Sequence, residues 1–466
     1  MIFHYYDKMT PTPELNYSMK HNIKRILFLG APLLAGRLSH YSHQVADSIM
    51  LGHFGEGSLE LGALAVAGMF FWVLNTFLWP LSNGVQAIVS RRVGAGGEAA
   101  KPENLGSVMD HGIITVLIFS ALAFVLSFLM EPLFRLILHE EKIIDLSLDY
   151  IRILRWSFVP QGVQFIIMRF FSSVQKPRYS MTTSLISNAV NIILNYIFIY
   201  GKFGLPQMGI KGAALGSLLS IWVGLIYIVS VAMRKEHIGK YRFFHTRKID
   251  WKIIRSIIRI AMPPAIQNII AMLIMLFYEA MVENIGAVYL AATHIVLSFY
   301  RINKTIVGGF AHGAAILIGN DLGAENKEAA KRVMHAGYLI GAVIGLVVFI
   351  LVFCFPGTVA SIFATPGETM NTAAAALRFF AVFFFFEILG FTFEMVFIGN
   401  GWGKYVLFSE FITNVLFILG FTFITTRIMG MGINMAWLGF GLYQLFHSLL
   451  LHFGYKSDRW VHAKVD

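Results

Sequence analysis

A short glycine–alanine motif occurs twice in this chain, once in each half. Residues 92–101 read RVGAGGEAAK and residues 321–331 read DLGAENKEAAK, so Gly94 and Gly323 lie 229 positions apart. A proline early in an apolar stretch recurs at nearly the same offset, because Pro32 and Pro263 are 231 positions apart. Matches in one order at one long spacing indicate an internal duplication. The chain is therefore expected to fold as two copies of one unit.

The composition indicates what kind of unit is duplicated. Of the 466 residues, 57% are hydrophobic and only 14% are charged, whereas soluble proteins carry roughly 25% charged residues. So few charges cannot cover a water-facing surface, which predicts a membrane protein. The single cysteine, Cys354, excludes an intramolecular disulfide. Residues 1–22 contain no apolar core, so we expect no cleavable signal peptide.

Twelve stretches are long and apolar enough for membrane-spanning helices. They lie near residues 24–50, 60–86, 107–130, 148–173, 179–201, 211–233, 253–284, 288–318, 334–354, 372–398, 404–426 and 433–454. The one long polar connection falls between the sixth and seventh stretches, where the repeat offset also divides the chain. We therefore predict an all-α polytopic membrane protein, with 12 transmembrane helices in two parallel six-helix lobes related by pseudo-two-fold symmetry.

The predicted domains follow from this division. They are an N-lobe over residues 1–233 (helices 1–6), a cytoplasmic basic linker over residues 234–252, and a C-lobe over residues 253–466 (helices 7–12) with a cytoplasmic tail. Lys and Arg concentrate in the linker and in the loops on its side of the membrane, which marks that side as cytoplasmic. We expect a multi-pass protein of the plasma membrane (the inner membrane where a cell has two), with both termini in the cytoplasm. The net charge of +11 would then face anionic lipid rather than nucleic acid.

The first and fifth predicted helices carry polar stripes that lipid would not tolerate. In the first helix, His40, His43 and Asp47 share one face at helical spacing. In the fifth, the stripe consists of Asn188, Asn191 and Asn195. A carboxylate among amide oxygens suits a hard cation such as Na⁺, and equally a buried carboxyl that carries H⁺. We predict that Asp47 and the three asparagines bind a coupling cation. The alternative is that these groups only hold helices together.

The second half carries its own ionisable residues, which are functional candidates because charges inside a membrane are costly. Glu279 lies 16 residues after Pro263, and Asp47 lies 15 after Pro32, so the two acids are nearly equivalent in the repeat. Helix ten carries two acids on one face. The candidates for a C-lobe substrate or coupling site are Glu279, Glu387, Glu394 and Arg301. The alternative is internal ion pairing, for example with Lys304.

Several of these pieces resemble the multidrug and toxic compound extrusion (MATE) family. Residues 45–50 read VADSIM and resemble the family's first-helix Val-Asp pattern, and the two glycine–alanine motifs resemble its paired motifs. Arg169 lies seven residues before Lys176-Pro177, where the family has an arginine in helix four. Residues 194–201 read LNYIFIYG and resemble the end of its fifth helix. The resemblance covers residues 20–455.

The resemblance implies a V of two lobes that exports organic, often cationic compounds in exchange for inward H⁺ or Na⁺. Asp47, Asn191 and Asn195 match the family's amino-lobe cation site residue by residue. The C-lobe departs from the NorM-like branch, because Ala271 stands where that branch has an acid in helix seven, and its helix-ten aspartate falls near Phe391. The resemblance therefore favours coupling through the amino lobe and leaves a second site in the C-lobe open.

The expected function is that of a secondary active antiporter exporting organic, cationic compounds in exchange for H⁺ or Na⁺ by alternating access. We expect no enzymatic activity, no cofactor and no bound metal. The expected partners are small organic molecules and membrane lipid, and the expected state is a monomer. One alternative is a flippase for lipids or lipid-linked saccharides, in which Arg37, Arg169, Arg301 and Lys304 would meet phosphate. Another is a membrane enzyme with a metal on His40, His43 and Asp47.

Overall fold

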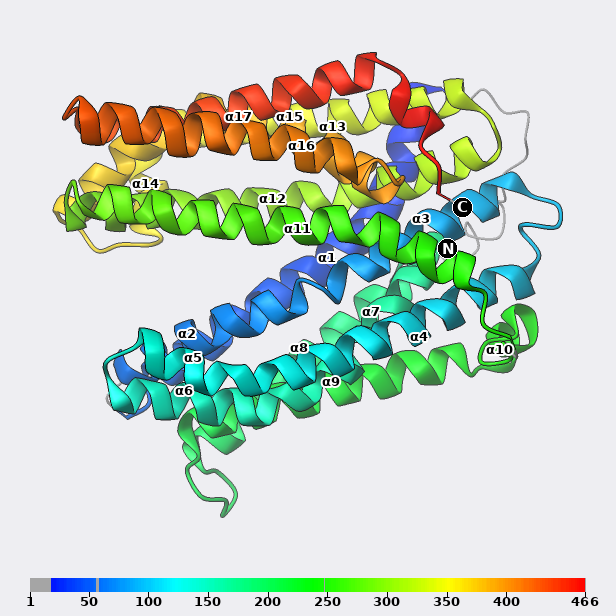
Figure 1. Ribbon diagram of the computed structural model, residues 1–466, viewed down its shortest axis with the longest axis horizontal. Helices are drawn as coiled ribbons and strands as arrows, with labels where there is room; N and C mark the ends of the chain where they lie inside the picture. Colours follow the sequence, from blue (N-terminus) through cyan, green and yellow to red (C-terminus); the bar gives the residue numbers. More distant parts are fainter. Residues whose placement is uncertain (1–17, 56–57, 247, 466) are drawn as a thin grey trace.

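The computed structural model describes residues 18–55, 58–246 and 248–465, and it contains helices and no β-strand within these ranges (Figure 1). The prediction that the chain has no cleavable signal peptide concerns residues 1–22, most of which lie outside the described residues. The α-helices are α1 (Met19–Gly52), α2 (Ser58–Asn75), α3 (Trp79–Ala95), α4 (Pro102–Leu126), α5 (Met130–Ile137), α6 (Glu141–Leu154), α7 (Phe158–Ser173), α8 (Arg178–Tyr200), α9 (Gly209–Ala232), α10 (Lys235–Tyr241), α11 (Trp251–Glu283), α12 (Ala287–Gly323), α13 (Lys327–Cys354), α14 (Pro356–Ser361), α15 (Glu368–Gly399), α16 (Gly403–Thr413) and α17 (Ile433–Lys456). Helix α16 continues as π-helical turns over Asn414–Phe421 and Ile424–Ile428.

These helices form the twelve predicted crossings. Some crossings consist of two helices in line, such as α2 with α3 and α6 with α7. Within the described residues, eight helical stretches are long and apolar enough by composition to cross a membrane. The remaining four crossings (α1, α6 with α7, α12 and α17) carry polar or charged side chains along their length. The predicted all-α, twelve-helix class is confirmed.

The helices pack into two lobes that separate toward one end, as Figure 1 shows. The end of the molecule that carries α10 and the glycine–alanine motifs is called here the basic end. Away from it, each lobe has its own hydrophobic core. One surrounds Phe134 in the first half, and the other surrounds Tyr278 and Phe380 in the second. Near the basic end the cores cross between lobes, since Ile257 of α11 joins the first-half core and Ile26 of α1 joins the second-half core. The lobes therefore form a V that opens away from the basic end.

The duplicated glycines form the closest approach between the lobes. A Cβ built on Gly94 of α3 would lie closer than 3.0 Å to the backbone of Asn320 in α12. In the reciprocal contact, a Cβ on Gly323 of α12 would lie closer than 3.0 Å to the backbone of Arg91 in α3. Only glycine permits two helix backbones to approach this closely. The sequence repeat is therefore a pair of equivalent contacts that holds the basic end closed.

Helix α1 packs against both lobes. In its first half, Gly30 lies against Phe310 and Leu34 against Gly309, both of α12 in the C-lobe. In its second half, the hydroxyl of Ser39 donates a hydrogen bond to the carbonyl of Ser184 in α8 of the N-lobe (3.1 Å). A structural change in the second half of α1 can thus be transmitted along one continuous helix to the contact between the lobes.

Candidate functional site

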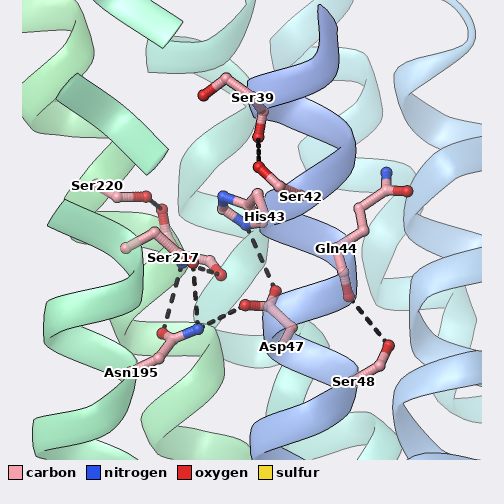
Figure 2. Close-up of polar contacts among 10 residues, drawn as sticks. Ser39, Ser42, His43, Gln44, Asp47, Ser48, Asn195, Ser217 and Ser220 are labelled. Carbon is pink, nitrogen blue, oxygen red and sulfur yellow. Dashed lines mark hydrogen bonds and ion pairs between the residues drawn. The ribbon is translucent and has the colours of Figure 1, made fainter. Parts of the chain in front are cut away.

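The second half of α1 carries a buried carboxylate that faces α8 and α9. Asp47 is only 4% exposed. The side-chain amide of Asn195 donates a hydrogen bond to Asp47 Oδ1 at 2.5 Å, and His43 Nε2 lies 3.4 Å from Asp47 Oδ2 (Figure 2). Each oxygen of the carboxylate therefore faces a nitrogen. We name this set, with Asn191 and Ser217, the N-lobe cluster.

Asn191 and Ser217 form the rear of the N-lobe cluster. The amide of Asn191 donates to Ser217 Oγ at 3.1 Å, and the amide of Asn195 also lies 3.3 Å from Asn191 Oδ1. Both asparagines are fully buried. Because Asn191 and Asn195 are one helical turn apart on α8 and each meets another polar group, the chain satisfies these buried amides internally. They hold the amide of Asn195 against Asp47.

A glycine on α9 makes room for the N-lobe cluster. A Cβ on Gly216 would lie closer than 3.0 Å to Asn195 Oδ1 and 3.1 Å from the backbone nitrogen of Asn195. We expect Gly216→Ala to displace this amide and lower the rate of coupled export about 10-fold or more, since small misplacements of a positioned group have effects of this size. The measurement is the initial rate of dye export from proteoliposomes.

The control for this variant is Gly68→Ala in α2, where a Cβ would meet nothing within 4 Å. We expect Gly68→Ala to export at the wild-type rate. Equal rates for Gly216→Ala and Gly68→Ala would contradict the role given to the position of Asn195.

Three of the predicted site residues lie apart from the buried polar groups. Asn188 lies nearer the basic end of α8 and donates to Ser42 Oγ at 3.0 Å rather than facing Asp47. Glu279 is part-exposed and lies 3.9 Å from His294 Nδ1, away from the other acids of its lobe. Arg301 is exposed and makes no ion pair among the described residues. Asn188 is thus outside the N-lobe cluster, Glu279 and Arg301 are apart from the buried acids of the C-lobe, and the predicted roles of all three stay predictions.

The C-lobe has a different polar centre, which we name the C-lobe cluster. Lys304 Nζ of α12 lies 3.4 Å from Glu387 Oε1 of α15. Farther along α15, Glu394 accepts a hydrogen bond from the Gln267 amide at 3.0 Å, and the same amide also meets Glu410 of α16. The three carboxyl groups are each 7% exposed. With one ammonium against three acids, the cluster must also hold protons or a bound cation.

A small cavity lies within the C-lobe cluster. It is lined by Tyr300, Lys304, Glu387, Gly390, Phe391, Glu394, Tyr443, Gln444, His447 and Ser448. Its volume of about 10 Å³ is close to the room that one water molecule needs. Buried atoms such as Glu387 Oε2 and His447 Nε2 have no hydrogen-bond partner among the described residues. The cavity has room for a small ion or a water molecule, and not for an organic substrate.

The Lys304–Glu387 pair predicts a specific stability pattern. We expect Lys304→Met to lower the free energy of unfolding by on the order of 3 kcal/mol, because it leaves a buried carboxylate without its cation. The double variant Lys304→Met/Glu387→Gln should regain most of that loss, since both charges are then gone. Thermal unfolding in detergent measures the stability of both variants. A Lys304→Met variant as stable as the wild type would show that the Lys304–Glu387 pair contributes little to stability.

Some cluster residues were not predicted from the sequence. Glu410 interrupts an apolar helix, so the rule that intramembrane charges are functional candidates would have found it. Ser217 has no such signal, because serine is common in transmembrane helices. The alternative of a metal on His40, His43 and Asp47 needs all three side chains to converge, but the two imidazole rings are 6.2 Å apart and only His43 reaches Asp47. Among the described residues, no group of three His, Cys, Asp or Glu side chains could hold a metal ion.

Two helical lobes that meet at one end, with a buried polar cluster in each, are the architecture expected of a polytopic membrane transporter. The sequence matches the MatE family over residues 32–197 and 263–424, which is one segment in each lobe. The chain belongs to this family, and the resemblance inferred from its motifs is confirmed.

Curated relatives and solved structures are similar along nearly the whole chain. A probable multidrug resistance protein NorM from Thermotoga maritima is 24% identical over 462 residues, covering 97% of this chain and 96% of that protein. One from Rhizobium meliloti is 23% identical, covering 80% and 79%. A transporter of the MOP superfamily from Pyrococcus furiosus has a TM-score of 0.86 at 21% identity, covering 95% and 97%. A MATE transporter variant from Vibrio cholerae has a TM-score of 0.85 at 18% identity, covering 95% and 99%.

Proposed function

We propose that this protein is a secondary active exporter of organic, cationic compounds, driven by an inward flow of H⁺ through the N-lobe cluster. The relatives named as multidrug resistance proteins support export of organic compounds. The observation that carries the coupling proposal is the contact of buried Asp47 with Asn195 and His43. A carboxylate inside a membrane is costly, which makes Asp47 a candidate for a role in the transport cycle.

The atoms that face Asp47 favour H⁺ over Na⁺ as the coupling ion. Na⁺ is bound by oxygen ligands, and here a side-chain amide nitrogen and an imidazole nitrogen face the carboxylate. To bind Na⁺, the amide of Asn195 would have to turn so that its oxygen faced Asp47. Binding of a proton needs no such rearrangement, because the imidazole of His43 is itself a proton donor and acceptor.

Helix α1 supplies the connection between proton binding and the lobes. Protonation of Asp47 removes the charge that Asn195 and His43 hold, and it thereby changes the packing of α1 on α8. The same helix packs on α12 through Gly30 and Leu34. Proton binding shifts the equilibrium between two lobe arrangements to the extent that one arrangement binds the proton more tightly. The V that opens away from the basic end is one of the two arrangements.

We place the basic end in the cytoplasm, with both termini there and the protein in the plasma membrane. The support is the concentration of Lys and Arg in the loops and linker of that end. In this orientation the V opens to the outside. The C-lobe cluster has room only for a small ion or water, so we assign it a supporting role in proton binding rather than substrate binding. We treat the protein as a monomer.

Reconstitution separates export from lipid flipping. Purified protein in liposomes should move a cationic dye against its gradient when a proton gradient is imposed, and it should leave the distribution of a fluorescent phospholipid between leaflets unchanged. Phospholipid flipping without dye movement would reject the proposal in favour of the flippase. The variant Asp145→Asn, which changes an exposed acid of α6, is the control for effects of substitution and purification. It should move dye as the wild type does.

A further inference from the structure

Two arginines lie against one tryptophan where the arms of the V meet. The guanidinium carbon of Arg37 in α1 is 5.9 Å from the ring centre of Trp79 in α3, and that of Arg169 in α7 is 5.6 Å away. Both arginines are half-buried, and Trp79 is 37% exposed. The three side chains come from three helices of the N-lobe. Arg37 also lies against Gly308 of α12, in the other lobe.

Neither guanidinium has an acidic partner. Among the described residues, no carboxylate lies within 4.0 Å of Arg37 or Arg169. The buried ammonium of Lys304, by contrast, does have an acidic partner in Glu387. Two like charges near one another in a poorly hydrated place are unfavourable unless an anion joins them. An arrangement of this kind points to a ligand that supplies the negative charge.

Neutral groups hold both arginines in place and leave most of their donors free. Arg37 donates to His312 Nδ1 of α12 at 2.6 Å, and Arg169 donates to Gln86 Oε1 of α3 at 3.1 Å. A guanidinium carries five N–H donors, and among the described residues each of these two makes this single side-chain hydrogen bond. A Cβ on Gly308 would lie closer than 3.0 Å to Arg37, so α12 of the other lobe also fixes its position.

We propose that Arg37 and Arg169 bind a carboxylate of the transported compound, while Trp79 holds the two guanidiniums in place. The fork of a guanidinium fits the two oxygens of a carboxylate. The ring of Trp79 holds both guanidiniums by cation–π contact and leaves their hydrogen-bonding edges for a ligand. This inference rests on the proposed function and assigns two residues that determine its selectivity. Among the exported compounds, Arg37 and Arg169 favour those that carry a carboxylate as well as the basic group expected of a cationic substrate. The site joins α1 to α12, so substrate contacts both lobes where they meet.

The test uses two dyes that differ in one group, a xanthene dye with a free carboxylate and its methyl ester. Binding of each is measured by fluorescence polarisation to protein in nanodiscs of phosphatidylcholine. We expect Arg169→Gln to weaken binding of the carboxylate dye about 10- to 100-fold, as loss of a charged hydrogen bond does, and to change binding of the ester less than about 2-fold. Arg427→Gln, an exposed arginine distant from Trp79 in sequence, should leave both unchanged.

Further variants keep the test decisive if Arg169→Gln fails to fold. Arg169→Lys keeps the charge without the fork, and Arg37→Gln removes the other cation. Each should weaken the carboxylate dye selectively while ester binding reports on folding. Equal weakening of both dyes, or no weakening, would overturn the inference. Displacement of the carboxylate dye from wild type by phosphatidylglycerol in the nanodisc would also overturn it, because the site would then belong to a lipid phosphate.

Failure of this inference and failure of the proposed function give different results. If the proposed function is wrong, wild-type protein in liposomes will export neither dye under a proton gradient. If only the carboxylate site is wrong, wild type will export both dyes, and Arg169→Gln will affect the two exports equally.

Discussion

Asp47→Asn is expected to abolish uphill export while leaving the protein folded and able to bind substrate. Asparagine has nearly the shape of aspartate, so it can still meet Asn195 and His43. It cannot take up or release a proton at transport pH, so it removes the step that connects proton flow to the lobes. An inward proton across 100 mV supplies roughly 2.3 kcal/mol. Without it, the variant can move substrate only down its gradient.

The measurement compares two kinds of transport in proteoliposomes. We expect Asp47→Asn to lose dye accumulation under an imposed proton gradient almost completely, and to retain dye exchange when dye is present on both sides. Asp145→Asn is the matched control, since it makes the same substitution at an exposed position, and it should behave as wild type. Accumulation by Asp47→Asn at the wild-type rate would remove Asp47 from the coupling mechanism.

Gly94→Ala is expected to open the basic end. The added methyl group would press on the backbone of Asn320, and backbone cannot move aside as a flexible side chain can. Overpacking of this kind costs about 1–3 kcal/mol, and that cost falls only on the arrangement in which the lobes touch here. We expect the population open at the basic end to rise about 10-fold, with a matching fall in export.

Cysteine labelling measures this opening. Ser90 of α3 is fully buried beside Gly319 of α12, and Ser90→Cys in a Cys354→Ser background places one thiol between the lobes. A water-soluble maleimide should label it slowly in this background and about 10-fold faster when Gly94→Ala is added. Gly68→Ala, with no atom within 4 Å of the new methyl group, should not change the rate. Equal labelling rates in all three would contradict the role assigned to the duplicated motif.

The sequence was sufficient to predict the duplication, the helical class and the pairing of α1 with α8. Periodicity and composition determine these features, because a long apolar run in lipid must be helical. Asp47, Asn191 and Asn195 come together as their helical spacing indicated. Spacing gives the face of a helix but not the relative depth of two helices. Asn188 therefore shares a face with the other asparagines and still meets Ser42.

The C-lobe was harder to predict because the repeat is inexact. Glu279 follows its proline by one residue more than Asp47 does, and one residue turns a helix by about 100°. Its side chain consequently lies near His294, while the buried acids of this lobe gather around Lys304 and Gln267. Pseudo-symmetry predicts that two lobes share a backbone arrangement. It does not predict which side chains occupy equivalent places.

The most direct test of proton coupling through Asp47 is to impose a proton gradient and a Na⁺ gradient separately on the wild-type protein. In sodium-free buffer, an imposed difference of one pH unit supplies about 1.4 kcal/mol per proton and should drive dye accumulation in proteoliposomes. At equal pH on both sides, an imposed Na⁺ gradient should not. Accumulation driven by the Na⁺ gradient alone would contradict proton coupling through Asp47, and would mean that the amide of Asn195 turns its oxygen toward a bound cation.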